Sequence, residues 1–367
     1  MYKNKTVGVV VPCYNEGKQI GDVIETMPDF VDRIIIINDC SLDNTLDVVK
    51  SYFDTDHNKS DLRLTTVKMM SRRGNYEAAE KIIWERNQEE MKYFTPSEVL
   101  NKNPESERII LINFLEKGGK GGGVARGYKW AKDYGLDCTA IMDGDGQMDP
   151  YELESICKPV IEEEVDYVKG NRLKHASAFE IIPKTRFLGN SILSILTKIA
   201  SGYWRVSDTQ SGYTAISKNA LNAIQIYKIY HSYGVPNDIL VKLNIAFCTI
   251  KEVVIKPVYN IGEQSKMKVF KIILPISLLL LKSFFKRLWI KYLFKDFHPL
   301  FLLYHLGIVL LLISIPFLIN LLVHLFKWGS ITPEQNVIFF VFLTITGFQS
   351  LFFAMWMDIQ DNDRLNK

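Results

Sequence analysis

Three aspartates crowd the segment DGDGQMD, which follows the short apolar run CTAIM. Such carboxylates repel one another unless a positive group lies among them. Ligands of an open parallel sheet bind at the carboxyl ends of its strands, so Asp143 and Asp145 should meet at such an edge. Gly144 and Gly146 let the chain bend there and let a ligand approach closely. Carboxylates with the neutral oxygen of Gln147 suit Mg²⁺ or Mn²⁺, which predicts a divalent ion bound to a diphosphate.

Two other interpretations of this segment exist. A surface turn rich in Asp and Gly fits the same letters equally well when the segment is taken alone. An EF-hand fits less well, because the loop lacks a glutamate at the twelfth position. The other motifs of the chain must therefore decide.

A glycine-rich stretch, EKGGKGGGVARG (116–127), follows another apolar run. Its glycines and Lys120 could hold the backbone close to a diphosphate at the start of a helix. It is not a Walker loop, because Gly121 stands where Ser or Thr should follow Lys120. By itself, a flexible loop explains the stretch equally well.

Polar residues also end the first two apolar runs, in VVPCYNEG and IIIINDCSLDNT. Glu16 could accept hydrogen bonds from ribose hydroxyls, and Asp39 could accept one from a base N–H. Helix capping is the alternative role for such residues. Farther along, Arg172 and Arg186 could bind an acceptor phosphate bidentately, although surface ion pairs explain them when they are considered without context.

Apolar strand-like runs separated by helix-like stretches predict an α/β fold with a mostly parallel sheet. Residues 54–108 break this rhythm, because the stretch is charged and contains NYEAAEKIIWERNQEEMKYF, which has the composition of a helix. We expect an insertion that is a solvated decoration rather than a binding site. The net charge of +3 gives no basic field for nucleic acid. The five cysteines form no CxxC pair and are expected to be buried thiols in a reducing compartment.

The C-terminal part is apolar enough to enter a membrane. At about 1.5 Å per residue, residues 299–326 and 337–357 can each cross a hydrocarbon core of about 30 Å. The short polar link KWGSITPEQN joins them, so we expect a transmembrane hairpin rather than two core helices. Two spans alone would have to bury the polar side chains of His305, Asn320 and His324, so we also expect a homo-oligomer.

Residues 263–298, just before the hairpin, mix basic and apolar side chains. The basic ones are Lys282, Lys286, Arg287, Lys291 and Lys295. This mixture predicts amphipathic helices in the membrane interface, with a break at Pro275. Basic residues beside the first span also place the catalytic side in the cytoplasm, at the plasma membrane of a bacterium. An ordinary solvated charged face is the alternative.

Taken in order, VVPCYNE, NDCSLDNT, GGKGGG, DGDGQMDP, GNR and DTQSGY resemble the motif series of the inverting family-2 glycosyltransferases of the GT-A fold. With GEQSK and the hairpin, the chain resembles a polyprenyl-phosphate glycosyltransferase. That group includes dolichyl-phosphate mannosyltransferases and bacterial enzymes that charge undecaprenyl phosphate. The resemblance covers residues 6–53 and 109–266 by motif. It implies a GT-A domain over residues 1–262 that carries the 54–108 insertion.

The resemblance also implies a role for each matched residue. The nucleoside and diphosphate would contact Pro12, Tyr14, Glu16, Asp39 and Lys120. Asp143 would face the ribose, sugar or diphosphate, while Asp145 and Gln147 would bind the metal. The acceptor phosphate would contact Arg172, Arg186, Asn190 and Lys266. The segment Ser207–Tyr213 would line the sugar pocket. Asp238 stands where many family-2 enzymes carry an acidic base, but an ionised phosphate needs no strong base, so Asp238 could only orient substrate.

The implied function is inverting transfer of a sugar from a nucleoside diphosphate sugar to a polyprenyl phosphate. A processive membrane polysaccharide synthase is the alternative enzyme, but the sequence has no QxxRW motif and has fewer apolar spans. A catalytically silent, nucleotide-binding membrane scaffold is the alternative from another class, and the set of aspartates and arginines argues against it. The sequence leaves open the sugar, the choice of UDP or GDP, the prenyl length, and Mg²⁺ or Mn²⁺.

Overall fold

Eight strands form one mixed sheet in the order β3-β4-β2-β1-β5-β7-β6-β8. The central parallel strands are β1 (Val7–Cys13), β2 (Arg33–Asn38), β4 (Ile109–Phe114) and β5 (Cys138–Ile141). The other strands are β3 (Ser97–Val99), β6 (Tyr167–Asn171), β7 (Thr214–Ser217) and β8 (Ile250–Val254). β3 is an antiparallel edge strand, β7 lies antiparallel between β5 and β6, and β8 runs parallel to β6. The expected α/β class with a mostly parallel sheet is confirmed.

This computed structural model describes residues 1–67, 78–232, 234–258, 269–326 and 333–367, without the side chains of 184–186, 188 and 269–273. GEQSK (262–266), including Lys266, lies outside these ranges. Of the five cysteines, all free thiols, four are buried as expected and Cys40 is half-buried.

The central strands are buried on both faces, which is why they consist of continuous Val and Ile runs. Val10, Ile35 and Ile37 face one core, and Val9 and Ile36 face the other. The first core is covered by α4 (Gly119–Asp133), α8 (Lys218–Ala223) and α9 (Val235–Ile245). The second is covered by α1 (Ile20–Glu25) and α5 (Leu153–Glu162), and α2 (Thr45–Ser51) packs on α1. Every strand end that matters for the site is therefore held by packing on two sides.

The expected insertion has an exposed part and an integral part. Its helix α3 (Ala78–Glu89) has no buried residue, as a solvated decoration would. The 3-10 turn that follows buries Glu90, whose carboxylate lies 3.1 Å from Lys132 Nζ and 3.8 Å from Lys129 Nζ on α4. The chain then joins the sheet as β3. The insertion is thus attached to α4 by buried charges.

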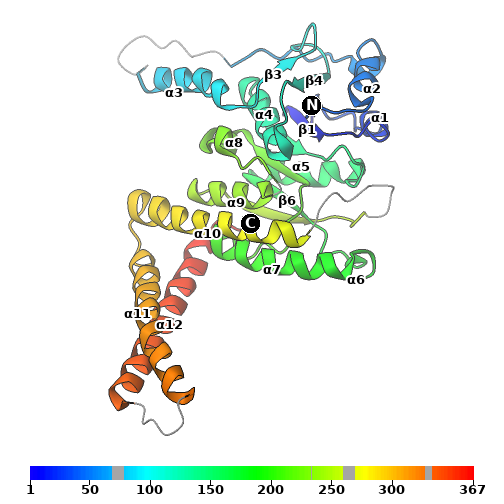
Figure 1. Cartoon of the computed structure of the whole chain (residues 1–367). Helices are drawn as coiled ribbons and strands as arrows, with labels where there is room; N and C mark the ends of the chain where they lie inside the picture. The colour runs from blue at the N-terminus through cyan, green and yellow to red at the C-terminus, as the bar shows by residue number, and fades with distance from the viewer. Residues whose placement is uncertain (68–77, 233, 259–268, 327–332) are drawn as a thin grey trace.

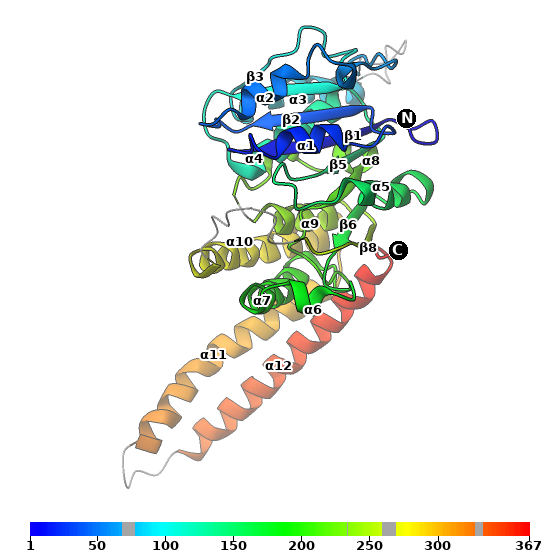
Figure 2. The same cartoon turned by 90° about the vertical axis from the view of Figure 1, so that its right-hand side faces the viewer.

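Three helices form the C-terminal part: α10 (Val269–Trp289), α11 (Leu300–Phe326) and α12 (Glu334–Asp363), with a π-helical turn (Ile290–Lys295) after α10. α11 and α12 run side by side away from the sheet domain, and α10 and α7 (Lys184–Ser201) lie where the hairpin leaves it (Figures 1 and 2). Both hairpin helices are long and apolar enough to cross a membrane, and only 11% and 17% of their most apolar windows are buried in the protein. Core helices would be mostly covered, so the interpretation as a hairpin is favoured over the interpretation as core helices.

Two expectations about this part need correction. α10 continues through Pro275, so the predicted break into two helices is wrong. Among the five basic residues expected at the membrane surface, Arg287 and Lys291 are fully buried, and only Lys282, Lys286 and Lys295 are exposed.

The polar residues of the hairpin have hydrogen bonds within the chain. His305 Nδ1 lies 2.7 Å from Phe301 O, His324 Nδ1 lies 2.9 Å from Asn320 O, and Asn336 donates to Asn320 Oδ1 at 3.2 Å. These contacts satisfy part of the hydrogen-bonding capacity of the polar residues within one chain, and the homo-oligomer stays a prediction.

The close packing of α4 on β1 predicts a stability difference between two glycines of that helix. A Cβ on Gly127 would lie 2.3 Å from Val10 Cγ1, whereas one on Gly122 would lie 3.2 Å from its nearest neighbour, Thr95 Oγ1. Gly127→Ala should therefore destabilise the domain by about 1–3 kcal/mol through overpacking. Gly122→Ala is the matched control and should cost less. Thermal unfolding of both variants in detergent checks this, and equal midpoints would contradict the described packing.

Candidate functional site

The crowded aspartates have the positive group that they need. Lys120 Nζ lies 2.6 Å from Asp143 Oδ2, so the glycine-rich stretch and the DGDGQMD segment meet as one site. Lys120 comes from the first turn of α4, and Asp143 follows the end of β5. The side chains of Lys120 and Asp143 are 36% and 20% exposed, so a ligand can still reach this ion pair.

Negative charge gathers around the end of β1. The pKa of the Cys13 thiol is raised well above its usual value, first by burial and then by the charges of Glu16, Asp143 and Asp145. A Cβ on Gly144 would lie 2.7 Å from Cys13 Sγ and 3.5 Å from the carbonyl oxygen of Pro12, so only glycine lets the two segments approach so closely. The structure thus brings together Pro12, Glu16, Asp143 and Asp145, as the sequence predicted.

Asp145 and Gln147 provide hard oxygen atoms beside this charge. The backbone N–H of Gln147 donates to Asp145 Oδ1 at 3.0 Å, which bends the loop around the carboxylate. The Gln147 side-chain nitrogen is buried and has no hydrogen-bond partner among the described residues, so no hydrogen bond from that nitrogen fixes the carboxamide. A carboxylate and a carboxamide oxygen are ligands that Mg²⁺ and Mn²⁺ accept.

The residues expected at the nucleoside line one edge of the site. Lys117 Nζ lies 3.5 Å from the ring centroid of Tyr14, a cation–π contact. Asp39 is buried, and its carboxylate accepts from the backbone N–H groups of Gly118 and Gly119 at 2.6 and 3.1 Å. The capping role is therefore what the structure shows for Asp39, at the start of α4. A contact of Asp39 with a base stays a prediction.

The segment Ser207–Tyr213 connects the donor side of the site to the arginine side. A Cβ on Gly212 would lie 3.4 Å from Lys120 Nζ and 3.5 Å from Asp143 Oδ2. One residue earlier, Ser211 accepts from Lys169 Nζ at 2.5 Å through its carbonyl and donates its N–H to Asp208 Oδ1 at 3.1 Å. These contacts place the segment beside Lys120 and Asp143, and its role in lining a sugar pocket stays a prediction.

Arg172 is held by a residue that the sequence analysis did not single out. Its Nε lies 2.8 Å from Asp208 Oδ2, its Nη2 lies 3.1 Å from Oδ1, and its backbone N–H also donates to Oδ2. Although burial alone would raise the pKa of Asp208, the charge and hydrogen bonds of Arg172 lower it overall. Asp208 therefore fixes the direction of the guanidinium. Its position inside DTQSGY was the available signal.

Lys169, in β6, was also missed. Its side chain is fully buried, and burial lowers its pKa to about 8 although the charge of Asp208 opposes this. A lysine inside a buried strand is the signal that could have found it, because such residues are rarely buried without a charged partner. Lys169 thus holds the Ser207–Tyr213 segment through Ser211 O, close enough to the buried Asp208 to feel its charge.

The Asp238 carboxylate has partners within the protein. Its carboxylate accepts from the backbone N–H of Tyr230 at 2.8 Å and pairs with Lys242 on the same helix. This fixes the chain at 230–231, where His231 O accepts from Gly121 N–H at 3.0 Å. The observed partners therefore give Asp238 a positioning role, one helix away from the ion pair of Lys120 and Asp143.

Two of the remaining acceptor residues lie on α7, and one lies outside the description. Asn190 is half-buried on α7. Arg186 belongs to the first turns of the same helix, but its side chain is not described, and neither is Lys266. α7 itself is joined to the site segment, because Ser194 Oγ lies 3.0 Å from Thr209 Oγ1.

The residues present fit a divalent cation. Within the described ranges, no three side chains of His, Cys, Asp or Glu form a metal cluster. Asp145 and Gln147 would therefore be the protein ligands, and diphosphate oxygens and water would complete the shell. Mg²⁺ usually binds phosphate substrates in this way, with one or two protein ligands and the rest of its shell from phosphate oxygens and water.

A mostly parallel sheet with charged residues at the carboxyl ends of its strands is the arrangement of a GT-A-like fold. Residues 8–79 and 95–225, more than half of the chain, match the model for glycosyl transferase family 2. The chain belongs to that family.

Two curated relatives are archaeal. One is the UDP-N-acetylglucosamine–dolichyl-phosphate N-acetylglucosaminyltransferase of Methanococcus voltae, 28% identical over 258 residues that cover 70% of this chain and 87% of the relative. The other is an uncharacterised protein of Methanocaldococcus jannaschii, 24% identical over 70% of this chain and 84% of that protein. Among solved structures, glucosyl-3-phosphoglycerate synthase of Mycobacterium tuberculosis, with Mn²⁺ and UDP, is 15% identical over 77% of this chain and 80% of that one, with a TM-score of 0.46.

The ion pair between Asp238 and Lys242 predicts how variants of Asp238 behave. Asp238→Asn should destabilise the chain by about 3–5 kcal/mol, because it leaves the buried ammonium of Lys242 unpaired. The double variant Asp238→Asn/Lys242→Met removes that charge and should recover most of the stability. Thermal unfolding and turnover are measured for both variants. A double variant that is stable but inactive would show that the carboxylate has a chemical role and would contradict the positioning role.

Proposed function

We propose that the protein transfers a single sugar from a nucleoside diphosphate sugar to a polyprenyl phosphate, with inversion at the anomeric carbon. The observation that carries this proposal is the attachment of a largely uncovered apolar hairpin to the arginine side of a family-2 glycosyltransferase domain. The relative in Methanococcus voltae is named for transfer to dolichyl phosphate, which supports the same acceptor class here.

The surface around the hairpin supports contact between this end of the domain and the membrane. Large apolar side chains are exposed on α6 (Ala178–Ile181), α7 and α10: Phe179, Ile181, Ile192, Ile195, Leu274, Leu278, Leu281 and Trp289. These helices lie at the end of the domain from which the hairpin leaves (Figures 1 and 2). With the exposed Lys282, Lys286 and Lys295, this end would lie in the interface of a cytoplasmic membrane face.

A cavity lined by residues that follow Arg172 in the chain supports the proposal that the acceptor binds on this side. A cavity of about 550 Å³ is lined by His175, Ser177, Glu180, Ile181, Lys256, Pro257 and Val258. It combines basic and apolar side chains, as a lipid phosphate requires. The backbone N–H of His175 donates to the carbonyl of Arg172 at 3.3 Å, so one turn of the chain joins this cavity to the residue that we assign to the acceptor phosphate.

The donor would bind at the opposite end of the Ser207–Tyr213 segment. Tyr14, Glu16 and Asp39 would contact the nucleoside, and Lys120 would contact the diphosphate. Asp145 and Gln147 would hold Mg²⁺ or Mn²⁺, which neutralises charge on a leaving diphosphate. Since Lys120 already balances Asp143, bound diphosphate would compete with Asp143 for that ammonium.

In the proposed reaction, an acceptor phosphate oxygen attacks the anomeric carbon as the bond to the diphosphate breaks. The new bond forms on the opposite face of the sugar, and the nucleoside diphosphate leaves with the bonding electrons. The phosphate is already ionised, so no side chain has to remove a proton. What the chain supplies is positioning by Arg172 and its partner Asp208, and charge stabilisation around Lys120.

The proposal predicts one lipid product. The purified full chain, with Mg²⁺ or Mn²⁺ and a short polyprenyl phosphate, should add one sugar from a single member of a panel of UDP- and GDP-sugars, detected by mass spectrometry. The matching polyprenol without phosphate is the control acceptor and should stay unchanged. A sugar polymer would favour a polysaccharide synthase, and nucleotide release without any lipid product would contradict the acceptor class.

The assignment of Asp145 predicts a loss of turnover. Asp145→Ala should lower kcat by about a hundredfold or more, because the leaving diphosphate loses its charge stabilisation. The control is Asp149→Asn, since Asp149 belongs to the same segment but caps the next turn and pairs with Lys256. Mn²⁺ binding in the presence of UDP, followed by electron paramagnetic resonance, should weaken only in the first variant. Full activity of Asp145→Ala with metal present would rule out the assignment.

A further inference from the structure

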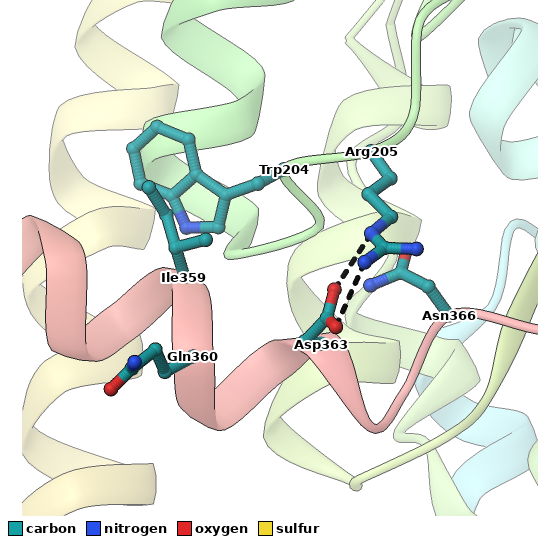
Figure 3. Close-up of a pocket in the computed structure, with 6 residues that line it drawn as sticks. All are labelled: Trp204, Arg205, Ile359, Gln360, Asp363 and Asn366. Atoms are coloured by element: carbon teal, nitrogen blue, oxygen red, sulfur yellow. Dashed lines mark hydrogen bonds and ion pairs between the residues drawn. The ribbon is translucent and has the colours of Figure 1, made fainter.

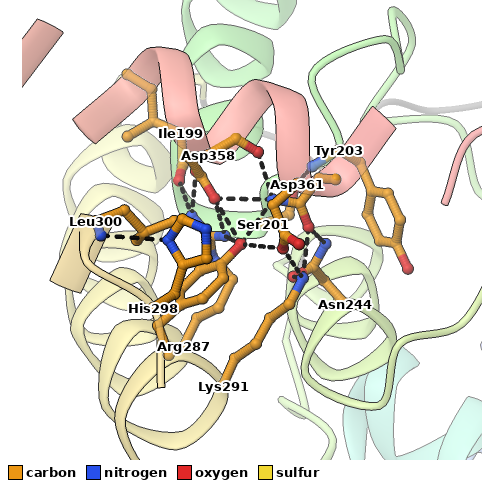
Figure 4. A network of polar contacts seen from close by, with 12 residues as sticks. Ile199, Ser201, Tyr203, Asn244, Arg287, Lys291, His298, Leu300, Asp358 and Asp361 are labelled. Atoms are coloured by element: carbon orange, nitrogen blue, oxygen red, sulfur yellow. Dashed lines mark hydrogen bonds and ion pairs between the residues drawn. The ribbon is translucent and has the colours of Figure 1, made fainter. Parts of the chain in front are cut away.

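The last turns of α12 enter the sheet domain and end in a buried polar cluster, shown in Figure 4. Arg287, on α10, is fully buried and forms a bidentate pair with Asp358 at 2.7 and 2.8 Å. Lys291, also fully buried, donates to Asn362 at 2.6 Å and to Asn244 of α9 at 3.1 Å. We call these five residues the α12 cluster. It joins the membrane hairpin to two helices of the domain.

The same guanidinium also holds the end of α7. Arg287 Nε donates to Ala200 O at 3.0 Å, and Nη2 donates to Ile199 O at 3.1 Å. The last carbonyls of a helix have no partner within the helix, so Arg287 satisfies two of them. Gly202 ends α7 with φ +79, and a Cβ there would lie 2.5 Å from Arg287 Nη1. The helix end is therefore shaped to receive this side chain.

α7 is the helix that carries Arg186 and Asn190 in its first turns. Its middle contacts the site through Ser194 with Thr209, and through Thr197, which donates to Asn237 at 3.2 Å. Asn237 in turn accepts from Gln210 at 2.9 Å. A change in the position of the C-terminal end of α7 would thus be passed to the Ser207–Tyr213 segment and to the proposed acceptor residues.

Simple anchoring does not explain the α12 cluster. An apolar hairpin is held in a bilayer by its exposed surface, and burying a pair of charges often contributes nothing to stability compared with apolar residues of the same size. What a bidentate pair adds is a fixed direction and distance. The bilayer would determine the depth of the hairpin. The pair of Arg287 and Asp358 would then determine the position of α7 relative to the hairpin.

We infer that Arg287 and Asp358 are positioning residues for the lipid acceptor, which fix the height of α7 relative to the membrane. This inference rests on the proposed function. The reacting phosphate of a membrane lipid lies at a set depth, so a site that uses it must be held at the matching depth. The donor is soluble and has no such requirement. The α12 cluster should therefore affect the use of acceptor and leave donor binding unchanged.

The test uses full-length variants in phospholipid nanodiscs that contain polyprenyl phosphate. Asp358→Asn removes half of the pair, and Arg287→Lys keeps a charge beside Asp358 but loses the fork to Ile199 O and Ala200 O. Both should raise the acceptor KM by about tenfold or more, since small misplacements are costly in catalysis. UDP or GDP binding, measured by calorimetry, should stay within about twofold of wild type, well below the tenfold that 1.4 kcal/mol would give.

The matched control is Arg205→Ala, which breaks the exposed pair between Arg205 and Asp363 at the same end of α12 (Figure 3). It should leave the acceptor KM unchanged. A double variant, Arg287→Met/Asp358→Leu, leaves no buried charge of the pair without its partner, so it should lose less stability than Asp358→Asn while the acceptor KM stays raised. That combination separates positioning from stability.

The outcomes distinguish the two proposals. Folded variants with the acceptor KM of the wild type would overturn this inference alone, and so would an equal loss of donor and acceptor binding. A wild-type chain that transfers no sugar to any lipid phosphate, yet binds nucleotide, would overturn the proposed function together with this inference. A raised acceptor KM with unchanged nucleotide binding supports both.

Discussion

Buried charge that must be paired is the constraint on which this structure depends. Arg172 with Asp208 and Arg287 with Asp358 each place a charge where water cannot reach it freely. Removing one partner from such a pair leaves a desolvated charge that costs several kcal/mol, so each pair holds its two segments together. The first pair joins β6 to the site segment, and the second joins α10 to the hairpin. The parts of the chain that must cooperate in catalysis are joined by these pairs.

The donor edge of the site differs, because like charges lie close together there. There the negative charges of Glu16, Asp143 and Asp145 gather around the end of β1, and one lysine, Lys120, is the cation that pairs with Asp143. Carboxylates that lie close together repel one another, and a bound cation reduces that repulsion. The glycines of the two facing segments make this possible, because a side chain on Gly144 would collide with Cys13. The close approach of the two segments is therefore what brings these carboxylates near one another.

Much of this was predictable, and the reasons are local. Apolar runs such as Arg33–Asn38 identify buried parallel strands, and strand ends in an α/β sheet must share one edge. That logic was enough to bring Lys120, Asp143 and Asp145 together. It did not identify the role of Lys169, because periodicity shows that this lysine lies in a buried strand but not which group is its partner. It also misjudged Arg287 and Lys291, because a basic residue beside apolar ones has the same pattern whether it reaches lipid headgroups or a buried aspartate.

A phosphate acceptor, as we propose, would explain why positive groups rather than a base dominate the second half of the site. A hydroxyl acceptor would need a carboxylate able to take its proton, and that carboxylate would have to be without a strong partner. Asp238 accepts from the backbone N–H of Tyr230 and pairs with Lys242, so its observed contacts fix a loop. A phosphate acceptor needs no proton removed, but it does need guanidinium groups whose direction is fixed. Asp208 gives Arg172 that direction, so the observed pairing is the one that a phosphate nucleophile would require.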